Sequence, residues 1–203
     1  MSKKFNSQTL MAIGVLAVSF IALFVSVRQT SIMSEQTRLL VEQNKASAWP
    51  RLEIGLSKSF IGNREDGFKI SRFMVKINNK GTGPAIVESV RVLFDGKPAN
   101  DWGEFYHLIG VPDSIPKGHS NSTIMNNVIA SNEELIMLNL TNNPALMEYI
   151  YQYADKFSME ICYKSVYDDH WIAKRQGFYS GIDDVTTEKI SGCQVSAQEL
   201  FLE

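Results

Sequence analysis

The two cysteines carry the most definite chemistry in this sequence. Cys162 and Cys193 are the only cysteines in 203 residues, too few for a disulfide scaffold or a cysteine-rich zinc module. In an oxidising compartment, a bridge between them would close a loop of about 32 residues and stabilise the fold by roughly 3–4 kcal/mol. Cys162 lies among apolar residues, so a buried free thiol is the alternative. The sequence leaves both interpretations open.

The histidines and carboxylates form no recognisable catalytic or metal-binding pattern. His107, His119 and His170 lie far apart, and none has a second histidine or cysteine two to four residues away, as zinc sites usually do. Asp168-Asp169-His170 has the residue types of a base and its orienting acid. Adjacent residues on a turn point in different directions, however, which predicts a solvated hairpin tip. We therefore predict no catalytic residue, no cofactor and no metal; an enzyme site assembled from distant residues is an alternative.

Aromatic residues gather late in the chain, between Tyr149 and Tyr179. Most are expected in the core, because aromatic side chains dominate the packing of β-sandwiches. The others are candidates for an exposed recognition face, where tyrosine and tryptophan are common. Tyr167 and Trp171 are the candidate interface residues of this region.

The overall composition is that of a globular protein. Hydrophobic residues make up 44% and charged residues 21%, with a formal net charge of -2. These values exclude a wholly disordered chain and a polytopic membrane protein. A nucleic-acid-binding protein would normally carry a basic surplus, so no nucleic-acid partner is expected.

The N-terminal region predicts a membrane anchor. A short basic tail, residues 1–8, precedes an uncharged apolar run at 9–27. As a helix this run would extend about 28 Å, close to the hydrocarbon thickness of a bilayer. A cleavable signal peptide would end in small residues, whereas this run ends in Val27-Arg28-Gln29. The sequence therefore indicates an uncleaved single-pass helix with the membrane as a partner.

Positive charges flank both ends of this run and leave its orientation nearly balanced. Long C-terminal domains cross the membrane largely regardless of charge, and the short lysine-containing tail resembles that of a signal anchor. We expect the N-terminus inside and the large domain outside. In a bacterium this is the inner membrane, with the domain in the periplasm.

Residues 28–48 contain no glycine or proline and predict a helical stem. Apolar residues recur every seven positions at Val25, Ile32, Leu39 and Ala46. The companion positions are all glutamine: Gln29, Gln36 and Gln43. Either the membrane helix simply continues into solvent, or the stem self-associates through residues such as Ile32 and Leu39. Trp49-Pro50 ends the stem. Trp49 is expected to pack against the following domain and is a further candidate interface residue.

The period changes to two after Pro50, which predicts a β domain over 49–179. Expected strands are 51–56, 69–78, 85–94, 122–128, 135–139, 159–167 and 170–174. Helical insertions are expected at 101–109 and 144–156, the second with Asn143 as N-cap and Pro144 at its first position. Residues 180–203 resemble a polar C-terminal tail with a short helix at 195–201. The predicted fold is an N-terminal transmembrane helix followed by an antiparallel Ig-like β-sandwich with one or two helical insertions.

The segment between two of these strands has the pattern N-x-G-x-G-P-A, formed by Asn79, Gly81, Gly83, Pro84 and Ala85. It resembles the corner of bacterial immunoglobulin-like and CARDB-like adhesion or binding modules. With Trp49-Pro50 and Asp95-Gly96-Lys97, the whole chain is similar to a group of uncharacterised bacterial single-pass membrane proteins. The resemblance implies a structural corner and no activity: the glycines would permit positive φ, and Ala85 is small enough to enter the core.

Three functions are consistent with these features. The first is a membrane-anchored, non-catalytic β-sandwich that mediates protein–protein interaction or self-assembly, with an unidentified protein or a second copy as partner. The second is a ligand-sensing or effector subunit of a bacterial stress or defence system, and the third is an envelope enzyme with an unrecognised site. A deep polar pocket would favour the second, and converging titratable groups would favour the third.

Overall fold

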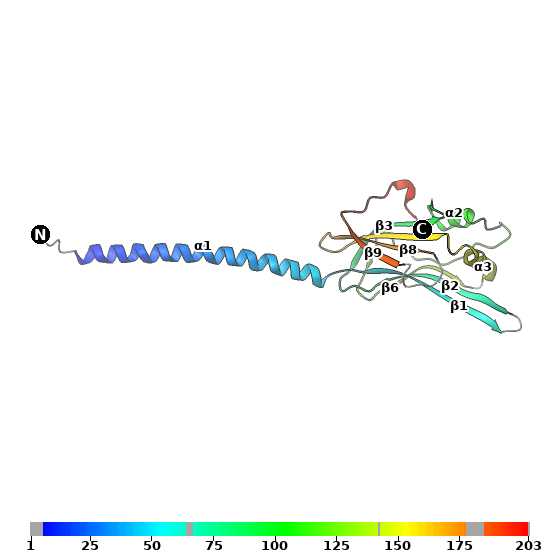
Figure 1. Cartoon of the computed structure of the whole chain (residues 1–203), viewed down its shortest axis with the longest axis horizontal. Helices are drawn as coiled ribbons and strands as arrows, with labels where there is room; N and C mark the ends of the chain where they lie inside the picture. The colour runs from blue at the N-terminus through cyan, green and yellow to red at the C-terminus, as the bar shows by residue number, and fades with distance from the viewer. Residues whose placement is uncertain (1–5, 64–66, 142, 178–184, 203) are drawn as a thin grey trace. The chain divides into compact units, whose positions relative to one another are not determined.

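The computed structural model describes residues 6–63, 67–141, 143–177 and 185–202. They belong to two compact units, Met1–Ala46 and Ser47–Glu203. The first unit is helical and the second is built mainly from antiparallel strands (Figure 1). An N-terminal apolar helix followed by a β-sandwich is the fold class that the sequence predicts, and the structure confirms it.

The first unit is formed by helix α1 (Ser7–Ser47), which is long and apolar enough to span a membrane and has no buried residue. It covers both the predicted membrane span and the predicted stem. Polar residues in it are satisfied locally: the hydroxyl of Ser19 donates to the carbonyl of Val15 at 2.9 Å. The guanidinium of Arg28 lies 5.3 Å from the ring centre of Phe24, one turn earlier, where the apolar run ends.

The second unit is a sandwich of two sheets. The smaller sheet has the order β1-β2-β6, and the larger has the order β4-β3-β7-β8-β9 with β5 also paired to β3. The smaller sheet contains β1 (Leu52–Asn63), β2 (Gly67–Asn79) and β6 (Glu134–Thr141). The larger contains β3 (Ala85–Phe94), β4 (Lys97–Ala99), β5 (Val128–Ile129), β7 (Phe157–Lys164), β8 (His170–Gln176) and β9 (Val185–Ile190).

The core lies between the two sheets, because alternate residues of each strand point inward. In β7 the inward residues are Phe157, Met159, Ile161 and Tyr163, all buried. Side-chain hydrogen bonds also cross between the sheets. The Tyr163 hydroxyl accepts from the amide of Leu52 at 3.1 Å, and Arg175 Nη1 donates to the carbonyl of Ile54 at 3.0 Å.

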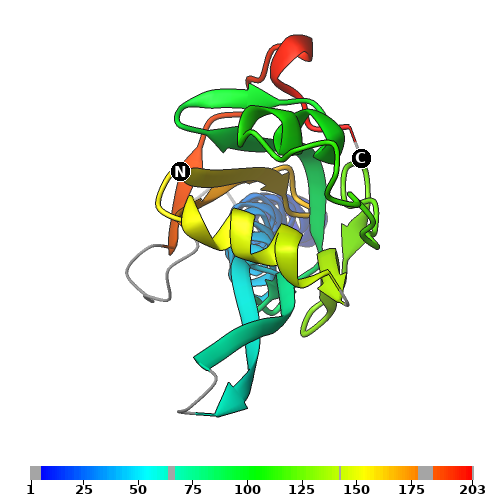
Figure 2. The ribbon, with the colours of Figure 1, turned by 90° about the vertical axis from the view of Figure 1, so that its right-hand side faces the viewer.

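Two short helices lie beside the sandwich (Figure 2). In α2 (Trp102–Leu108), the carboxylate of Asp101 accepts from the amide of Glu104 at 2.7 Å. In α3 (Pro144–Gln152), the Asn143 side chain accepts from the amide of Leu146 at 3.2 Å, as expected for an N-cap. The second helix ends four residues before the predicted end, and its last turn gives way to a turn at 153–155.

The C-terminal region differs most from the sequence-based expectation. The predicted polar tail contributes β9 and a 3-10 helix, η2 (Ala197–Glu199), and ends with Phe201 buried in the core. Because β9 lies at the edge of its sheet, it is only partly covered and needs few apolar residues. The polar sequence of β9 therefore resembles that of an unstructured C-terminal tail. The predicted strand at 122–128 is wrong apart from its last residue: 122–124 and 127 have no regular structure, 125–126 form a turn, and β5 begins at Val128.

Candidate interaction site

The hairpin of β1 and β2 carries several of the large exposed apolar side chains of the sandwich unit that the structure describes. Its strands are 12 and 13 residues long, above the usual range of about 3–10, and Figure 2 shows the hairpin projecting beyond the body of the domain. Near its end, Phe60, Ile61 and Phe68 are 48%, 64% and 65% exposed. Exposed apolar clusters of this kind commonly mark binding surfaces.

A bulge sets which of these side chains share a face. The register shifts between Ser59 and Phe60, after which Phe60 pairs with Ile70 and Gly62 with Phe68. Phe60, Phe68 and Ile70 therefore lie on one face of the hairpin, and Ile61 lies on the other. Gly62 has a φ of 133°, and a Cβ there would collide with the carbonyl of Gly67, so this position requires glycine.

The face with the two phenylalanines borders α3 and forms a groove of about 350 Å³. The rings of Phe60 and Tyr151 meet edge to face, with centres 6.3 Å apart. This space, termed the hairpin groove below, is lined by Phe60, Gly67, Phe68, Lys69, Ile70, Pro144, Glu148 and Tyr151.

Cationic groups border the aromatic part of the hairpin groove. Lys58 Nζ lies 4.9 Å from the ring centre of Tyr151. Burial, and secondarily the nearby positive charge of Arg175, lower the pKa of Lys58 from its usual value. Glu148 adds one negative charge to the lining, whereas Lys69 pairs with Ile61 and so belongs to the other face of the hairpin. The site thus combines an aromatic wall with the positive charge of Lys58 and the negative charge of Glu148.

A strand edge runs beside the groove, because β1 is the outermost strand of its sheet. At the start of β1, backbone groups on the outer side are satisfied by Tyr163 and Arg175 from the other sheet. In the described part of the chain, β1 has β2 as its sole strand partner. The edge next to Phe60 therefore offers backbone groups for pairing with an extended peptide.

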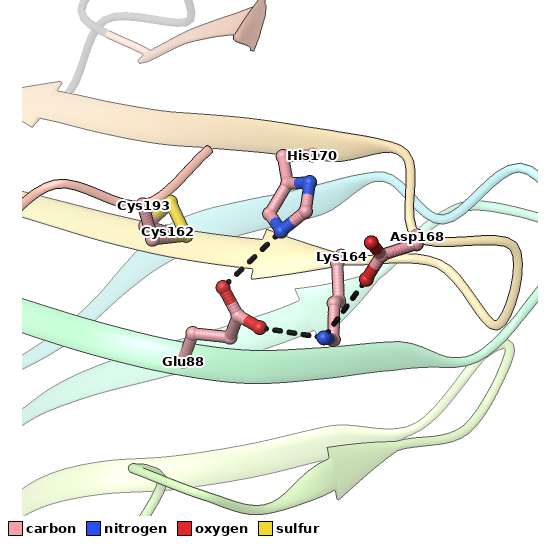
Figure 3. Close-up of a disulfide and its surroundings, with 6 residues drawn as sticks. All are labelled: Glu88, Cys162, Lys164, Asp168, His170 and Cys193. Atoms are coloured by element: carbon pink, nitrogen blue, oxygen red, sulfur yellow. Dashed lines mark ion pairs between the residues drawn. A yellow bond between two sulfur atoms is a disulfide. The ribbon is translucent and has the colours of Figure 1, made fainter. Parts of the chain in front are cut away.

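The structure joins Cys162 of β7 to Cys193 in a disulfide, with Cα atoms 5.8 Å apart (Figure 3). The bridge holds the segment 191–202, termed the C-terminal strap, against the larger sheet. The strap also contacts β3, where Arg91 lies 3.6 Å from Glu199, and ends with the amide of Phe201 donating to Val90. The disulfide is thus a structural tie.

Near this bridge, a charged cluster connects three strands of the larger sheet (Figure 3). Lys164 Nζ lies 2.9 Å from both Glu88 and Asp168, and His170 Nε2 lies 3.4 Å from the other oxygen of Glu88. Hydrogen bonds to these two carboxylates raise the pKa of Lys164, and Lys164 lowers the pKa of Asp168. The ion pairs of the cluster thus connect β3, β7 and β8. The ion-pair partner of His170 is Glu88 of β3, and not one of the two aspartates that precede it in the sequence.

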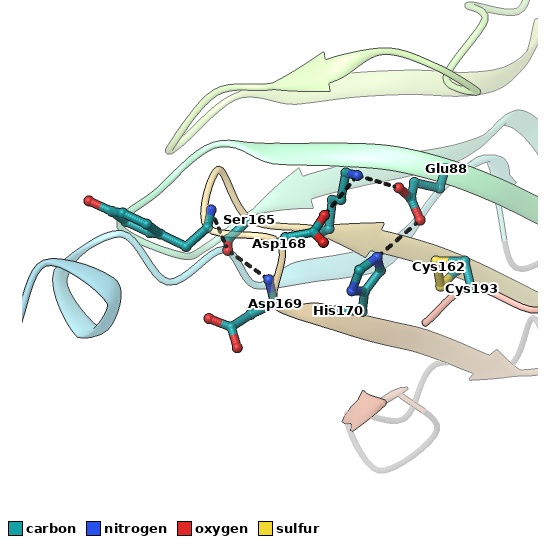
Figure 4. A network of polar contacts seen from close by, with 9 residues as sticks. Glu88, Cys162, Ser165, Asp168, Asp169, His170 and Cys193 are labelled. Atoms are coloured by element: carbon teal, nitrogen blue, oxygen red, sulfur yellow. Dashed lines mark hydrogen bonds and ion pairs between the residues drawn. A yellow bond between two sulfur atoms is a disulfide. The ribbon is translucent and has the colours of Figure 1, made fainter. Parts of the chain in front are cut away.

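The turn that carries this cluster is organised by Ser165 (Figure 4). Its hydroxyl accepts from the amides of Tyr167 and Asp169 at 3.1 and 3.4 Å. Asp168 has a φ of 63°, a conformation that aspartate tolerates in turns. Asp169 pairs with Lys189 of β9 at 2.7 Å. These contacts account for Asp168-Asp169-His170 as parts of a hairpin turn.

The corner predicted at 79–85 is built around Asn79, which is fully buried. Its side chain accepts from the amides of Arg51 and Gly81 and donates to the carbonyls of Gly83 and Ile129. Pro84 follows the glycines, and Ala85, also fully buried, begins β3.

Positive φ, the expected reason for the corner glycines, is wrong. Neither Gly81 nor Gly83 is among the residues with positive φ. A Cβ on Gly81 would instead collide with the carbonyl of Trp49, and one on Gly83 with the carbonyl of Ala48. Close approach of the segment that enters the domain, which sequence spacing does not reveal, explains both glycines.

The structure does not bring the candidate interface residues together. Trp171 is 8% exposed and stacks on Tyr163, so it belongs to the core. Tyr167, 38% exposed, lies at the turn between β7 and β8. Trp49 remains 42% exposed, and its carbonyl, not its ring, accepts hydrogen bonds from the corner. Ile32 and Leu39 lie on α1 in the other unit.

Sequence reasoning missed the hairpin groove because it ended one strand at 56 and began the next at 69, which left Phe60 and Phe68 in the connection. The available signal was a pair of apolar segments, Phe60-Ile61 and Phe68, directly flanking the polar turn at 63–67. Apolar residues on both sides of a hairpin tip, beyond the reach of the other sheet, have no core to enter. The projection of the hairpin is a tertiary feature that alternation alone does not give.

A second hollow, of about 500 Å³, lies elsewhere on the domain and is lined mainly by polar residues. Among them, Asn139 has a side-chain oxygen that is buried without a hydrogen-bond partner in the described residues. The lining residues are Pro116, Gly118, His119, Ser120, Asn139, Thr141 and Asn143.

Comparison with known proteins adds no assignment to this geometry. No protein-family model matches the chain, and no curated protein matches its sequence.

Proposed function

We propose that this chain is a membrane-anchored, non-catalytic β-sandwich module that binds another protein through the hairpin groove. The observation that carries the proposal is the exposed aromatic wall of Phe60 and Phe68 on a projecting hairpin, beside an open strand edge. Aromatic side chains that gain burial on binding dominate the energetics of protein interfaces. The open edge adds backbone hydrogen bonds to an extended segment.

The proposed anchor is α1, which is apolar enough to span a membrane and has no buried residue in the described chain. The proposed location of the domain is outside the cytoplasm, in the periplasm if the membrane is a bacterial inner membrane. The Cys162–Cys193 disulfide supports this side, because disulfides persist in oxidising compartments and are rare in the cytosol.

The proposed occupant of the groove is an extended protein segment with apolar side chains next to a carboxylate. The apolar side chains match Phe60, Phe68 and Tyr151, and the carboxylate matches Lys58. A lipid surface is a poorer match. The three residues between the strands are Arg64, Glu65 and Asp66, and burying such charges in hydrocarbon is costly.

The experiment compares three full-length chains purified from membranes in mild detergent: wild type, Phe60→Ser with Phe68→Ser, and the control Val166→Ser. Val166 is also exposed and apolar, at 56%, but lies at the turn between β7 and β8. We expect one stoichiometric partner to co-purify with wild type and control and to be lost from the groove variant. Retention of the partner by the groove variant, or its equal loss from the control, would contradict the proposal.

A second candidate function is small-ligand sensing at the polar hollow. The side-chain oxygen of Asn139, buried and without a partner among the described residues, favours a ligand with a hydrogen-bond donor. Thermal shift of the full-length chain against polar metabolites tests this function. A stabilisation present in wild type and lost in Asn139→Leu would support the polar hollow. No stabilisation in wild type, or the same stabilisation in Asn139→Leu, would leave the hairpin groove as the sole binding site proposed for the domain.

A further inference from the structure

Helix α1 presents a continuous exposed stripe that the proposed function does not use. The helix runs without interruption from Ser7 to Ser47, and none of its residues is buried. Beyond the predicted membrane span, Ile32 and Leu39 are 57% and 51% exposed. A helix of this length without a buried residue in the described chain needs another reason for apolar residues in its solvent part.

Two positions of a seven-residue repeat alternate along the whole helix. One position is apolar or small throughout: Met11, Val18, Val25, Ile32, Leu39 and Ala46. The other is apolar in the first half and glutamine in the second: Val15, Ala22, Gln29, Gln36 and Gln43. Their alternating spacing of four and three residues is the a and d pattern of a coiled coil. The seam therefore continues from the predicted membrane span into the stem.

We propose that α1 pairs with α1 of a second copy of this chain as a parallel, in-register two-helix assembly. Two copies anchored by the same end in one membrane are necessarily parallel. In register, Gln36 of one copy meets Gln36 of the other, and each amide can both donate and accept a hydrogen bond. A shift of half a repeat would place the glutamines against Ile32 and Leu39 and leave their amides unpaired. Polar residues at such positions fix register at some cost in stability.

The charged residues beside the seam fit this arrangement. Glu35 and Glu42 flank the seam, and both pair with Arg38 of the same helix, at 2.6 and 3.0 Å. In a parallel pair they face Leu40 and Ser47 of the other copy, so no carboxylate faces another. Leu40, 57% exposed, widens the apolar stripe on that side.

Disulfide trapping in native membranes tests the proposal. Both native cysteines are bonded to each other, so an engineered cysteine is the one free thiol. We expect mild oxidation to convert the Leu39→Cys chain into a species of twice the mass on a non-reducing gel. The control is Ser34→Cys, on the opposite face of α1, which should remain monomeric. No dimer from Leu39→Cys, or equal dimer from both chains, would overturn the proposal.

A charge placed in the seam tests the register. Adding Gln36→Glu to the Leu39→Cys chain would set two carboxylates against each other and should cause loss of the trapped dimer. Adding Ser34→Glu on the opposite face should leave the dimer unchanged. Persistence of the dimer with Gln36→Glu would rule out the in-register pair. Neither result depends on the hairpin groove, so failure here is distinct from failure of the proposed function.

Discussion

At the scale of single residues, buried polar side chains show most clearly how this fold is held together. Asn79 satisfies four backbone groups from three separate segments. The motif could be recognised from sequence, and so could the small size required at Ala85. The reason for the glycines could not, because it depends on the chain that returns at Trp49.

Replacing Asn79 by alanine should lower the free energy of unfolding by about 3 kcal/mol or more, because it leaves several buried backbone groups unsatisfied. Asn79→Asp keeps the size of the side chain and the two acceptor contacts. It should still destabilise, since a carboxylate oxygen would face the carbonyls of Gly83 and Ile129. Urea unfolding of the three chains measures both effects. Wild-type stability in Asn79→Ala would show that the corner does not depend on this side chain.

Two buried tyrosines give a matched pair of predictions at neutral pH. Tyr163 accepts from the amide of Leu52, so Tyr163→Phe should cost about 1–3 kcal/mol by leaving that amide unpaired. The Tyr106 hydroxyl is buried without a partner among the described residues. Tyr106→Phe should therefore be neutral or stabilising, by up to about 1 kcal/mol. Thermal unfolding that ranks the two variants in the opposite order would contradict this account.

The same tyrosines predict a loss of stability at alkaline pH. Burial raises the pKa of Tyr163 to about 12 and also raises the pKa of Tyr106, above the unfolded value of about 10. Because the pKa of each tyrosine is higher in the folded state than in the unfolded state, burial of the neutral hydroxyl contributes to the free energy of unfolding. This contribution is complete below about pH 10 and disappears as the pH rises toward 12. Unfolding free energies measured between pH 8 and 12 should fall less steeply for Tyr163→Phe than for wild type. Equal slopes would exclude this tyrosine as a cause.

At the scale of elements, alternation predicted the central strands well and the edges poorly. The range 85–94 matches β3, and the range 135–139 lies within β6. Edge strand β9 was missed because half-covered strands need few apolar residues. The hairpin of β1 and β2 was recognised in part, but its projection was not, since nothing local distinguishes a strand over the core from one beyond it.

The disulfide belongs to this scale, because it ties the C-terminal strap to β7. Cys193→Ser should lower the free energy of unfolding by about 3–4 kcal/mol, according to the loop that the bridge closes. Phe201→Ala removes the other end of the strap from the core and should cost about 3–5 kcal/mol. Hydrogen exchange should show faster exchange over 191–202 in the first variant while the hairpin groove stays unchanged. Unaltered exchange in the strap would mean that Phe201 alone holds it.

At the scale of the whole molecule, composition and hydropathy predicted an apolar helix followed by a β domain, and the structure has both. The two units suit different roles, since α1 can place the chain in a membrane and pair with a second copy, whereas the sandwich presents a groove. The sequence could not identify the groove, because Phe60, Phe68 and Tyr151 come from three elements and meet only in the folded domain.

The most direct measurement is site-specific photo-crosslinking from the groove in intact membranes. A photoreactive phenylalanine analogue replaces Phe68 in the full-length chain, and the control carries the analogue at Val166. Binding through the hairpin groove predicts one discrete adduct with a different protein from position 68, absent from position 166 and lost when Phe60→Ser is added. An adduct of the same yield from both positions, or none from position 68, would contradict the central claim.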